Sequence, residues 1–186
     1  KAAPRQATSA QRQPADEGML EEVARLYGVK PPQVHLVDLI PNVLTVLPDS
    51  PPVLVIGDPV YRSLTPEQKR FSFAWGCKLS AAGLVPLVGV GEKGLPALWT
   101  AVIQQFEPSY FAAGAVADEV FAHVTNLRKN FPRKAREELF GAAIECAGDK
   151  RIEVGRLYSD VCGYADRAAI LSCGDMGGAL QFVWHV

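Results

Sequence analysis

Apolar residues change their spacing once along this chain, near Gly57, and that change limits the possible fold more than any other feature. Before Gly57, apolar residues alternate or form short runs between turn residues, which predicts strands at residues 34–36, 42–47 and 52–57. After Gly57 they recur every three or four positions, as on one face of a helix. Short connections between the strands favour antiparallel pairing, because parallel neighbours need a long crossover. We therefore expect an α+β fold, mostly α, with a small antiparallel sheet followed by a bundle of helices.

The helical part opens with a start signal at Thr65. Thr65 can cap a helix, Pro66 suits its first position, and Gln68 can complete a capping box. The spacing predicts a helix from there to about Ala82. Residues 88–94 (VGVGEKG) are expected to form a glycine-rich loop, and they lack the residue order of a phosphate-binding loop. Further helices are expected at about residues 95–107, 115–130, 133–147, 151–173 and 175–184.

The ends of the chain differ in character. Residues 1–17 hold no large apolar side chain, so they cannot offset the entropy of ordering and are expected to be a flexible tail or linker. Residues 18–186 are expected to form one domain, beginning near Met19 with a helix that stops at Gly28. The apolar C-terminal residues are expected to close a core or to meet a neighbouring domain: Leu180, Phe182, Val183 and Trp184.

Charge and hydropathy exclude two classes of partner. The formal net charge is −1 over 186 residues, which provides no overall positive field for a phosphate backbone, so no nucleic acid is expected as a partner. No run of about 18 apolar residues occurs, so no membrane insertion is expected. The compartment stays open, with a cytoplasmic location favoured.

Cysteine and histidine are the residues most able to carry metal or nucleophilic chemistry. The cysteines contain no C-x-x-C pair and are expected to be buried, reduced thiols: Cys77, Cys146, Cys162 and Cys173. No two histidines have the four-residue spacing of a helical metal site: His35, His123 and His185. We therefore expect no metal and no other cofactor. A cysteine–histidine pair that meets only in space stays open as an alternative.

Two segments together resemble a known family. Residues 51–83 read PPVLVIGDPVYRSLTPEQKRFSFAWGCKLSAAG, and residues 158–175 read YSDVCGYADRAAILSCGD. The first segment resembles the strand, short helix and active-site helix of the H-E-x-x-H zinc metallopeptidases related to the CAAX prenyl proteases and minimal gluzincins. The second resembles a later helix of that family, in which a glutamate ligand stands four residues before the Asp of an E-x-x-A-D-R phrase. The resemblance covers about residues 19–175 and implies a gluzincin-like frame.

The residues that would hold zinc in such a peptidase are replaced in this chain. The resemblance puts the two histidine ligands at Trp75 and Leu79, the catalytic glutamate at Gly76 and the third ligand at Cys162. One thiolate is not a zinc site, and the apolar replacements indicate a cleft that has become core. The resemblance therefore implies a catalytically inactive pseudo-peptidase that serves as a protein-interaction or scaffold domain of a larger protein. Asp166 is expected to have a structural role, capping or pairing inside the fold.

Other readings stay open beside this one. The spacing of Trp75 and Leu79 is also that of any buried helix, with no peptidase ancestor. The chain could be an enzyme of another class that uses a cysteine or acidic site not visible as a motif. It could also be a packing domain whose partner-binding surface lies elsewhere in a longer protein.

A basic cluster is the candidate surface for a protein partner of unknown identity: Arg128, Lys129, Arg133, Lys134 and Arg136. As a function, it could dock an acidic partner or a phosphate. As structure, it is the end of one predicted helix and the start of the next, and cations favour the C-terminal end of a helix dipole. Glu137 and Glu138 follow directly and offset part of its field.

Overall fold

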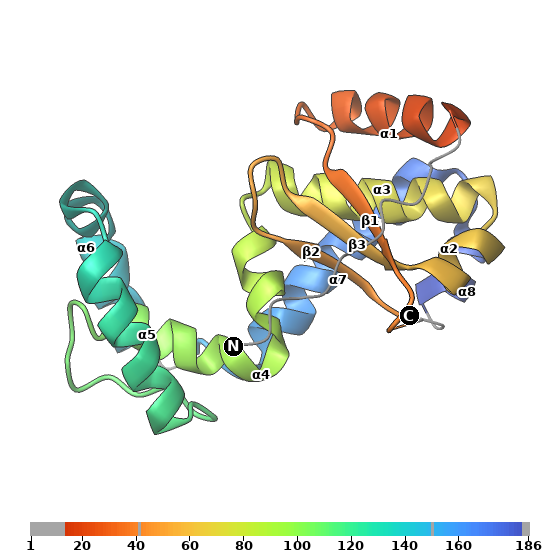
Figure 1. Ribbon diagram of the computed structural model, residues 1–186. Helices are drawn as coiled ribbons and strands as arrows, with labels where there is room; N and C mark the ends of the chain where they lie inside the picture. Colours follow the sequence, from red (N-terminus) through yellow and green to blue (C-terminus); the bar gives the residue numbers. More distant parts are fainter. Residues whose placement is uncertain (1–13, 41, 150, 184–186) are drawn as a thin grey trace. The chain divides into compact units, whose positions relative to one another are not determined.

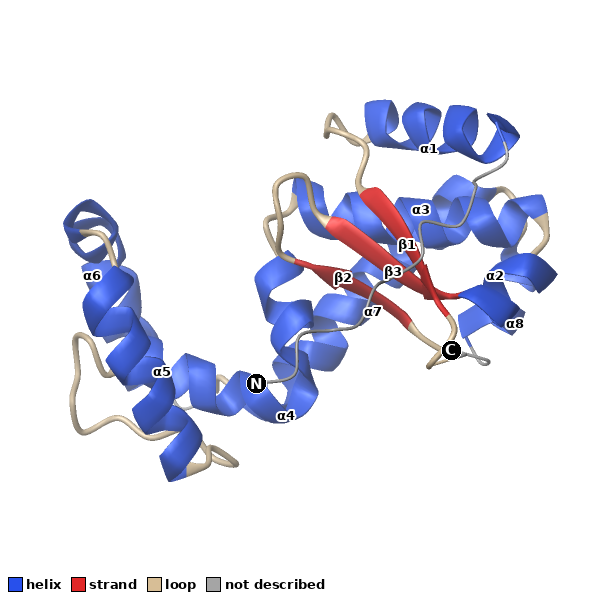
Figure 2. Cartoon of the chain, in the orientation of Figure 1, coloured by secondary structure: helices blue, strands red, loops and turns tan. Residues whose placement is uncertain are grey.

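The computed structural model describes residues 14–40, 42–149 and 151–183 (Figure 1). In chain order its elements are α1 (Pro14–Leu26), β1 (Gln33–Val37), β2 (Leu44–Leu47), β3 (Val53–Gly57), α2 (Asp58–Ser63), α3 (Pro66–Ala81), α4 (Val85–Ile103), α5 (Ala117–Asn130), α6 (Arg133–Gly148), α7 (Val154–Cys173) and α8 (Met176–Val183). The strands of Figure 2 form one small sheet and helices make up most of the rest, so the predicted α+β class with mostly α structure is confirmed.

The described residues divide into two compact units, which the sequence did not separate. Unit 1 comprises the residues up to Gly89 together with those from Val161 onward, and unit 2 is Val90–Asp160. Unit 1 holds the sheet, α1 to α3, α8 and most of α7. Unit 2 holds α5, α6 and the greater part of α4. The chain was expected to form one domain from residue 18 onward, whereas its contacts gather around two centres.

The sheet is mixed, and the expectation of an antiparallel sheet is wrong for one of its two strand pairs. The strand order is β1-β3-β2; β3 pairs antiparallel with β2 and parallel with β1. The reason lies in the strand order. Because β3 inserts between the first two strands, the chain from β1 to β3 runs through all of β2, and that connection is long enough for parallel neighbours.

One face of the sheet packs against α3. Leu54 and Ile56 of β3 and Val46 of β2 are fully enclosed. Val34 of β1 and Val46 of β2 lie on either side of Leu54 in the register of the sheet. A β-carbon added at Gly76 would lie 3.0 Å from Cδ1 of Leu54, so helix and sheet approach closely at that point. Figure 1 shows α3 running behind the strands.

The start of α3 is the one that the sequence predicted. Thr65 Oγ1 accepts a hydrogen bond from the backbone N–H of Gln68 at 3.3 Å, and Gln68 Oε1 accepts from the backbone N–H of Thr65 at 3.1 Å. This reciprocal pair is a capping box. Every residue from Phe71 to Cys77 is buried, so α3 is the central helix of unit 1.

The first helix begins earlier than expected. Residues 14–17 belong to α1 and not to the predicted tail of residues 1–17, because Asp16 has buried partners. Its carboxylate accepts a hydrogen bond from the Tyr61 hydroxyl at 2.9 Å and lies 3.1 Å from Nζ of Lys69. The start of this helix was missed because the buried residue there is an aspartate, and the prediction relied on the spacing of apolar residues. Residues 1–13 lie outside the described residues. The predicted stop at Gly28 is correct, with φ at +68°.

The predicted glycine-rich loop at residues 88–94 is helical, and this expectation is wrong. The segment lies inside α4, which continues through it with one break at Gly91, where φ is +77° and ψ is 166°. A side chain would be strained at this φ, so glycine permits the kink at which one helical segment ends and the next begins. The apolar residues between the glycines form one face of the helix, whereas the number of glycines had indicated a loop.

The C-terminal segment returns to the start of unit 1. The Tyr27 hydroxyl lies 2.6 Å from Oγ of Ser172, and Gln68 Nε2 donates to the Gly178 carbonyl at 3.2 Å. The expectation that Leu180 and Val183 close a core is wrong, because Leu180 is 45% exposed and Val183 is 38% exposed. Among the side chains of this helix that the structure describes, Ala179 is the buried one. Trp184 and the Phe182 side chain lie outside the described residues.

Within the described chain, no single helix is long and apolar enough to span a membrane. Only α3 and α4 taken together meet that length and composition, and they meet at a 92° bend.

Candidate functional site

The antiparallel pair α3 and α7 carries the candidate site of unit 1. Two side-chain contacts join the two helices among the described residues: Arg70 Nε donates to the Ser172 carbonyl at 2.9 Å, and Lys78 Nζ lies 4.5 Å from the centre of the Tyr164 ring. Between them, the Trp75 side chain lowers the pKa of the Asp166 carboxyl, which puts these two residues near one another. As the residue number rises along α3, the number of its partner on α7 falls by about the same amount. The two helices therefore lie side by side in one register over about two turns.

Three of the four positions of the resemblance are Trp75, Leu79 and Cys162, and they lie on α3 and α7. Trp75 and Leu79 are buried and four residues apart, so they share one face of α3. Cys162 is half-buried and lies one helical turn before Asp166. Counted along the same register, Cys162 of α7 lies about level with Leu79 of α3.

Gly76 is closed off from this region by the sheet. It is buried, and the nearest atoms to an added β-carbon all belong to the side chain of Leu54, the closest at 3.0 Å. A contact of that length forces the neighbour to move even for one methyl group. Position 76 therefore has no room for a glutamate side chain in this arrangement.

Asp166 is the ionisable group at the centre of the α3–α7 contact. Burial raises the pKa of this carboxyl, while the Trp75 side chain and the charge of Arg167 act in the opposite direction. The net direction is upward, so desolvation outweighs both stabilising contacts. The expected structural role of Asp166, pairing inside the fold, agrees with this contact. The identity of its partner was not foreseen.

The other candidate metal and nucleophile residues do not gather. Among the described residues, no group of three or more His, Cys, Asp or Glu side chains is placed to hold a metal ion. His35 lies on β1 and His123 on α5, in different units, and His185 lies outside the described residues. The cysteines of the described chain are free of disulfides, with Cys77 and Cys173 buried. Burial raises the pKa of Cys77 to about 12, which keeps it a neutral thiol.

The basic cluster of unit 2 separates into three kinds of side chain. Arg128 and Lys129 are exposed in the last turn of α5, where they complement the helix dipole. Arg133 and Lys134 form i, i+4 ion pairs with Glu137 and Glu138, at 2.9 and 3.7 Å. Arg136 is half-buried and its guanidinium lies 5.6 Å from the centre of the Phe131 ring.

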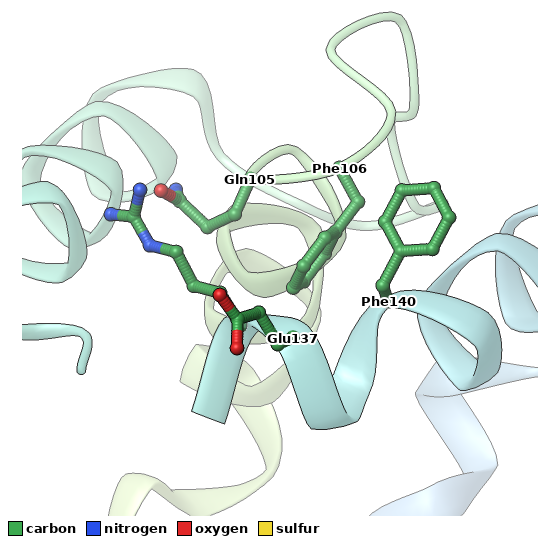
Figure 3. Close-up of a pocket in the computed structure, with 5 residues that line it drawn as sticks. Gln105, Phe106, Glu137 and Phe140 are labelled. Carbon is green, nitrogen blue, oxygen red and sulfur yellow. The ribbon is translucent and has the colours of Figure 1, made fainter. Parts of the chain in front are cut away.

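A pocket beside Arg136 was not foreseen from the sequence. It has a volume of about 500 Å³ and is lined by Gln105, Phe106, Arg136, Glu137 and Phe140, all in unit 2. Figure 3 shows Glu137 and Phe140 on one helix, with the Phe106 ring above them. The one sequence feature that pointed toward this pocket is that Phe131 and Phe140 stand on either side of the basic residues. Phe106, which lines the pocket with Phe140, comes from a distant segment and could not be paired with it from the sequence.

Comparison with known proteins gave no relatives. No family model matches the chain, and no curated protein or solved structure matches it.

Proposed function

We propose that this chain is a catalytically inactive, peptidase-like module that acts as a protein-interaction or scaffold domain. Support for the proposal comes from unit 1, where side chains of α3 and α7, the helices that carry the four positions of the resemblance, contact each other. The proposal combines the frame that the resemblance implies with side chains that can neither bind zinc nor activate water.

The observation that carries the proposal is the interaction of the Trp75 side chain with the Asp166 carboxyl, which acts against the rise in the pKa of that carboxyl. A histidine that binds a metal through one ring nitrogen almost always donates its other N–H to a carboxylate or carbonyl, which fixes the orientation of the ring. Trp75 occupies the position of the first histidine in the resemblance, and its side chain, whose indole N–H is a donor, interacts with the same kind of partner. A carboxylate that would orient a metal ligand thus interacts with an indole that cannot be one.

The absence of catalysis follows from the side chains at the four positions. Zinc needs three protein ligands with nitrogen, oxygen or thiolate donors, and Trp75, Leu79 and Cys162 supply one thiol between them. The water on such a metal is deprotonated by a neighbouring carboxylate in a peptidase. Gly76 carries no such group, and Leu54 occupies the space that it would need.

An enzyme of another class, which uses a cysteine or an acidic site not visible as a motif, is the alternative, and Cys77 is a poor candidate for its nucleophile. The thiolate is the nucleophile in enzymes that use a cysteine, and a pKa near 12 leaves almost none of it at neutral pH. A thiol in the described chain that reacts with a maleimide at pH 7 far faster than the others would support this alternative.

The first experiment is to restore the missing ligands. The triple variant Trp75→His, Leu79→His and Cys162→Glu places three zinc ligands on the α3–α7 register. We expect it to bind Co²⁺ with the visible absorption of a low-coordinate site, and to bind Zn²⁺ competitively. Circular dichroism of each variant shows whether it is folded.

Two matched variants test whether metal binding depends on the proposed geometry. Moving the second histidine by one residue, with Ser80→His in place of Leu79→His, puts the two imidazoles on different faces of α3 and is expected to abolish binding. Adding Asp166→Ala to the triple variant removes the orienting carboxylate and is expected to weaken metal affinity about 10- to 100-fold. Equal binding by the shifted variant, or a molar equivalent of zinc in the unmodified protein, would overturn the proposal.

A further inference from the structure

The pocket of unit 2 has an apolar wall that is open to solvent. The rings of Phe106 and Phe140 meet edge to face with centroids 6.1 Å apart, and 57% of Phe140 is exposed. Leu139 and Ile144 on the same helix are 42% and 41% exposed and extend this apolar surface. Exposed aromatic side chains beside a cavity are typical of surfaces that bind another molecule.

The polar side of the pocket is a guanidinium with spare hydrogen-bonding capacity. Arg136 Nε is enclosed, and within the described part of the chain it has no hydrogen-bond acceptor. Because Nε is enclosed, a ligand would reach this guanidinium at its Nη groups, which donate to no acceptor within the described residues. The neighbouring Glu137 does not serve, because its carboxylate accepts from Nε of Arg133 at 2.9 Å.

The charge around the pocket favours an acidic ligand. Residues 128–138 contain five basic and two acidic side chains, and both acidic ones form ion pairs on α6. Arg128 and Lys129 form no ion pair with any described residue. The segment that carries Arg136 is therefore net positive, and a carboxylate entering the pocket would meet Arg136 in a charge-assisted hydrogen bond.

We propose that this pocket binds an acidic peptide segment of a partner protein. One carboxylate of the segment pairs with Arg136, and an adjacent aromatic or branched aliphatic side chain packs on Phe106 and Phe140. The proposal rests on the function proposed above, that of an interaction module, and names the chemistry of its partner. Arginine and aromatic side chains are the residues that most often dominate the energy of protein interfaces.

The experiment uses the full chain and a defined probe. The probe is a fluorescein-labelled peptide, Asp-Glu-Phe-Asp-Glu with an amidated C-terminus, and binding is measured by fluorescence anisotropy at low salt. Two matched peptides separate the contributions: Asn-Gln-Phe-Asn-Gln lacks the charge, and Asp-Glu-Ala-Asp-Glu lacks the ring. We expect each to bind at least tenfold more weakly than the probe.

Variants of the protein locate the binding. Arg136→Gln is expected to weaken binding of the probe at least tenfold, whereas Lys134→Gln, which removes a charge from the same helix outside the pocket, changes it less than twofold. Glu137→Gln removes a negative charge from the pocket wall and is expected to tighten binding two- to threefold, a gain that misfolding cannot produce. Equal losses in Arg136→Gln and Lys134→Gln, equal binding of the uncharged peptide, or no binding of the probe would overturn the inference.

The two proposals can fail separately. Stoichiometric zinc in the unmodified protein would remove the inactive-peptidase proposal and leave the peptide result in unit 2 intact. Loss of peptide binding in a protein that contains no zinc would remove only the inference about the pocket.

Discussion

Two residues of α3, Gly76 and Trp75, determine what the α3–α7 region can do. Gly76 allows helix and sheet to approach until a β-carbon would lie 3.0 Å from Leu54. Trp75 is buried beside it, 5% exposed, and its side chain acts against the rise in the pKa of Asp166. Apolar packing therefore dominates this part of α3.

Enlarging Gly76 should disrupt the contact between α3 and the sheet. We expect Gly76→Val to lower the free energy of unfolding by about 1–3 kcal/mol, because added methyl groups in a packed core force neighbouring side chains to shift. Gly18→Val on α1 is the matched control, since an added β-carbon there meets nothing within 4 Å. Urea unfolding of both variants measures the difference. Similar unfolding free energies for the two would contradict the close approach.

Asp166 predicts a dependence of stability on pH. Burial raises its pKa above the ordinary value of 3.8, so the folded protein binds this proton more tightly than the unfolded chain does. Its contribution to stability is therefore present below pH 3.8 and is lost as the pH rises through the folded pKa. We expect Asp166→Asn to stabilise the protein at pH 7, with the gain shrinking toward pH 4.

Glu22 provides a comparison of opposite sign. The hydrogen bond and charge of Arg70 hold the pKa of Glu22 below its ordinary value, so its contribution is present at neutral pH and is lost as the pH falls through the folded pKa. Glu22→Gln should therefore lower stability at pH 7 and not near pH 3. Thermal unfolding from pH 3 to pH 7 measures both variants. A gain from Asp166→Asn that is the same at every pH would contradict the raised pKa.

At the scale of elements, α3 differs sharply from α5 and α6 in how much of it is enclosed. α3 has an unbroken buried run from Phe71 to Cys77. Within the described chain, Val120 is the one buried residue of α5 and Ala143 that of α6. Helices with few buried apolar contacts open locally at low free energy, whereas a central helix opens only when the surrounding structure unfolds.

This difference predicts the pattern of amide hydrogen exchange. Amides of α3 and β3 are expected to exchange the slowest, and those of α5 and α6 to exchange at least 100-fold faster, which corresponds to about 2.7 kcal/mol in opening free energy. Exchange followed by NMR or mass spectrometry provides the test. If the amides of α6 were as protected as those of α3, the prediction would be wrong, and α6 would have contacts in solution that this structure does not contain.

At the scale of the whole molecule, the chain builds unit 1 from its two ends and unit 2 from its middle. Tyr27 meets Ala168 and Ser172, at hydrogen-bond distances of 3.1 and 2.6 Å. The proposed metal-free frame lies in unit 1, whereas the proposed peptide pocket lies in unit 2. If both proposals hold, the scaffold and the binding surface are separate parts of one chain.

The sequence by itself determined the local structure. Thr65, Pro66 and Gln68 specify the start of α3 through hydrogen bonds within one turn, and the three-residue and four-residue spacing of apolar side chains set the positions of α5 to α8. These signals depend on residues close together in the chain, so they can be read without knowing the fold.

Tertiary structure alone decided the rest, because those features depend on residues far apart in sequence. The parallel pairing of β1 with β3 follows from the insertion of β3 between two earlier strands. The burial of Asp16, the interaction of Trp75 with Asp166, and the meeting of Phe106 with Phe140 each join separate segments. Local propensity carries no information about such pairs; packing selects them when the chain encloses its apolar surface.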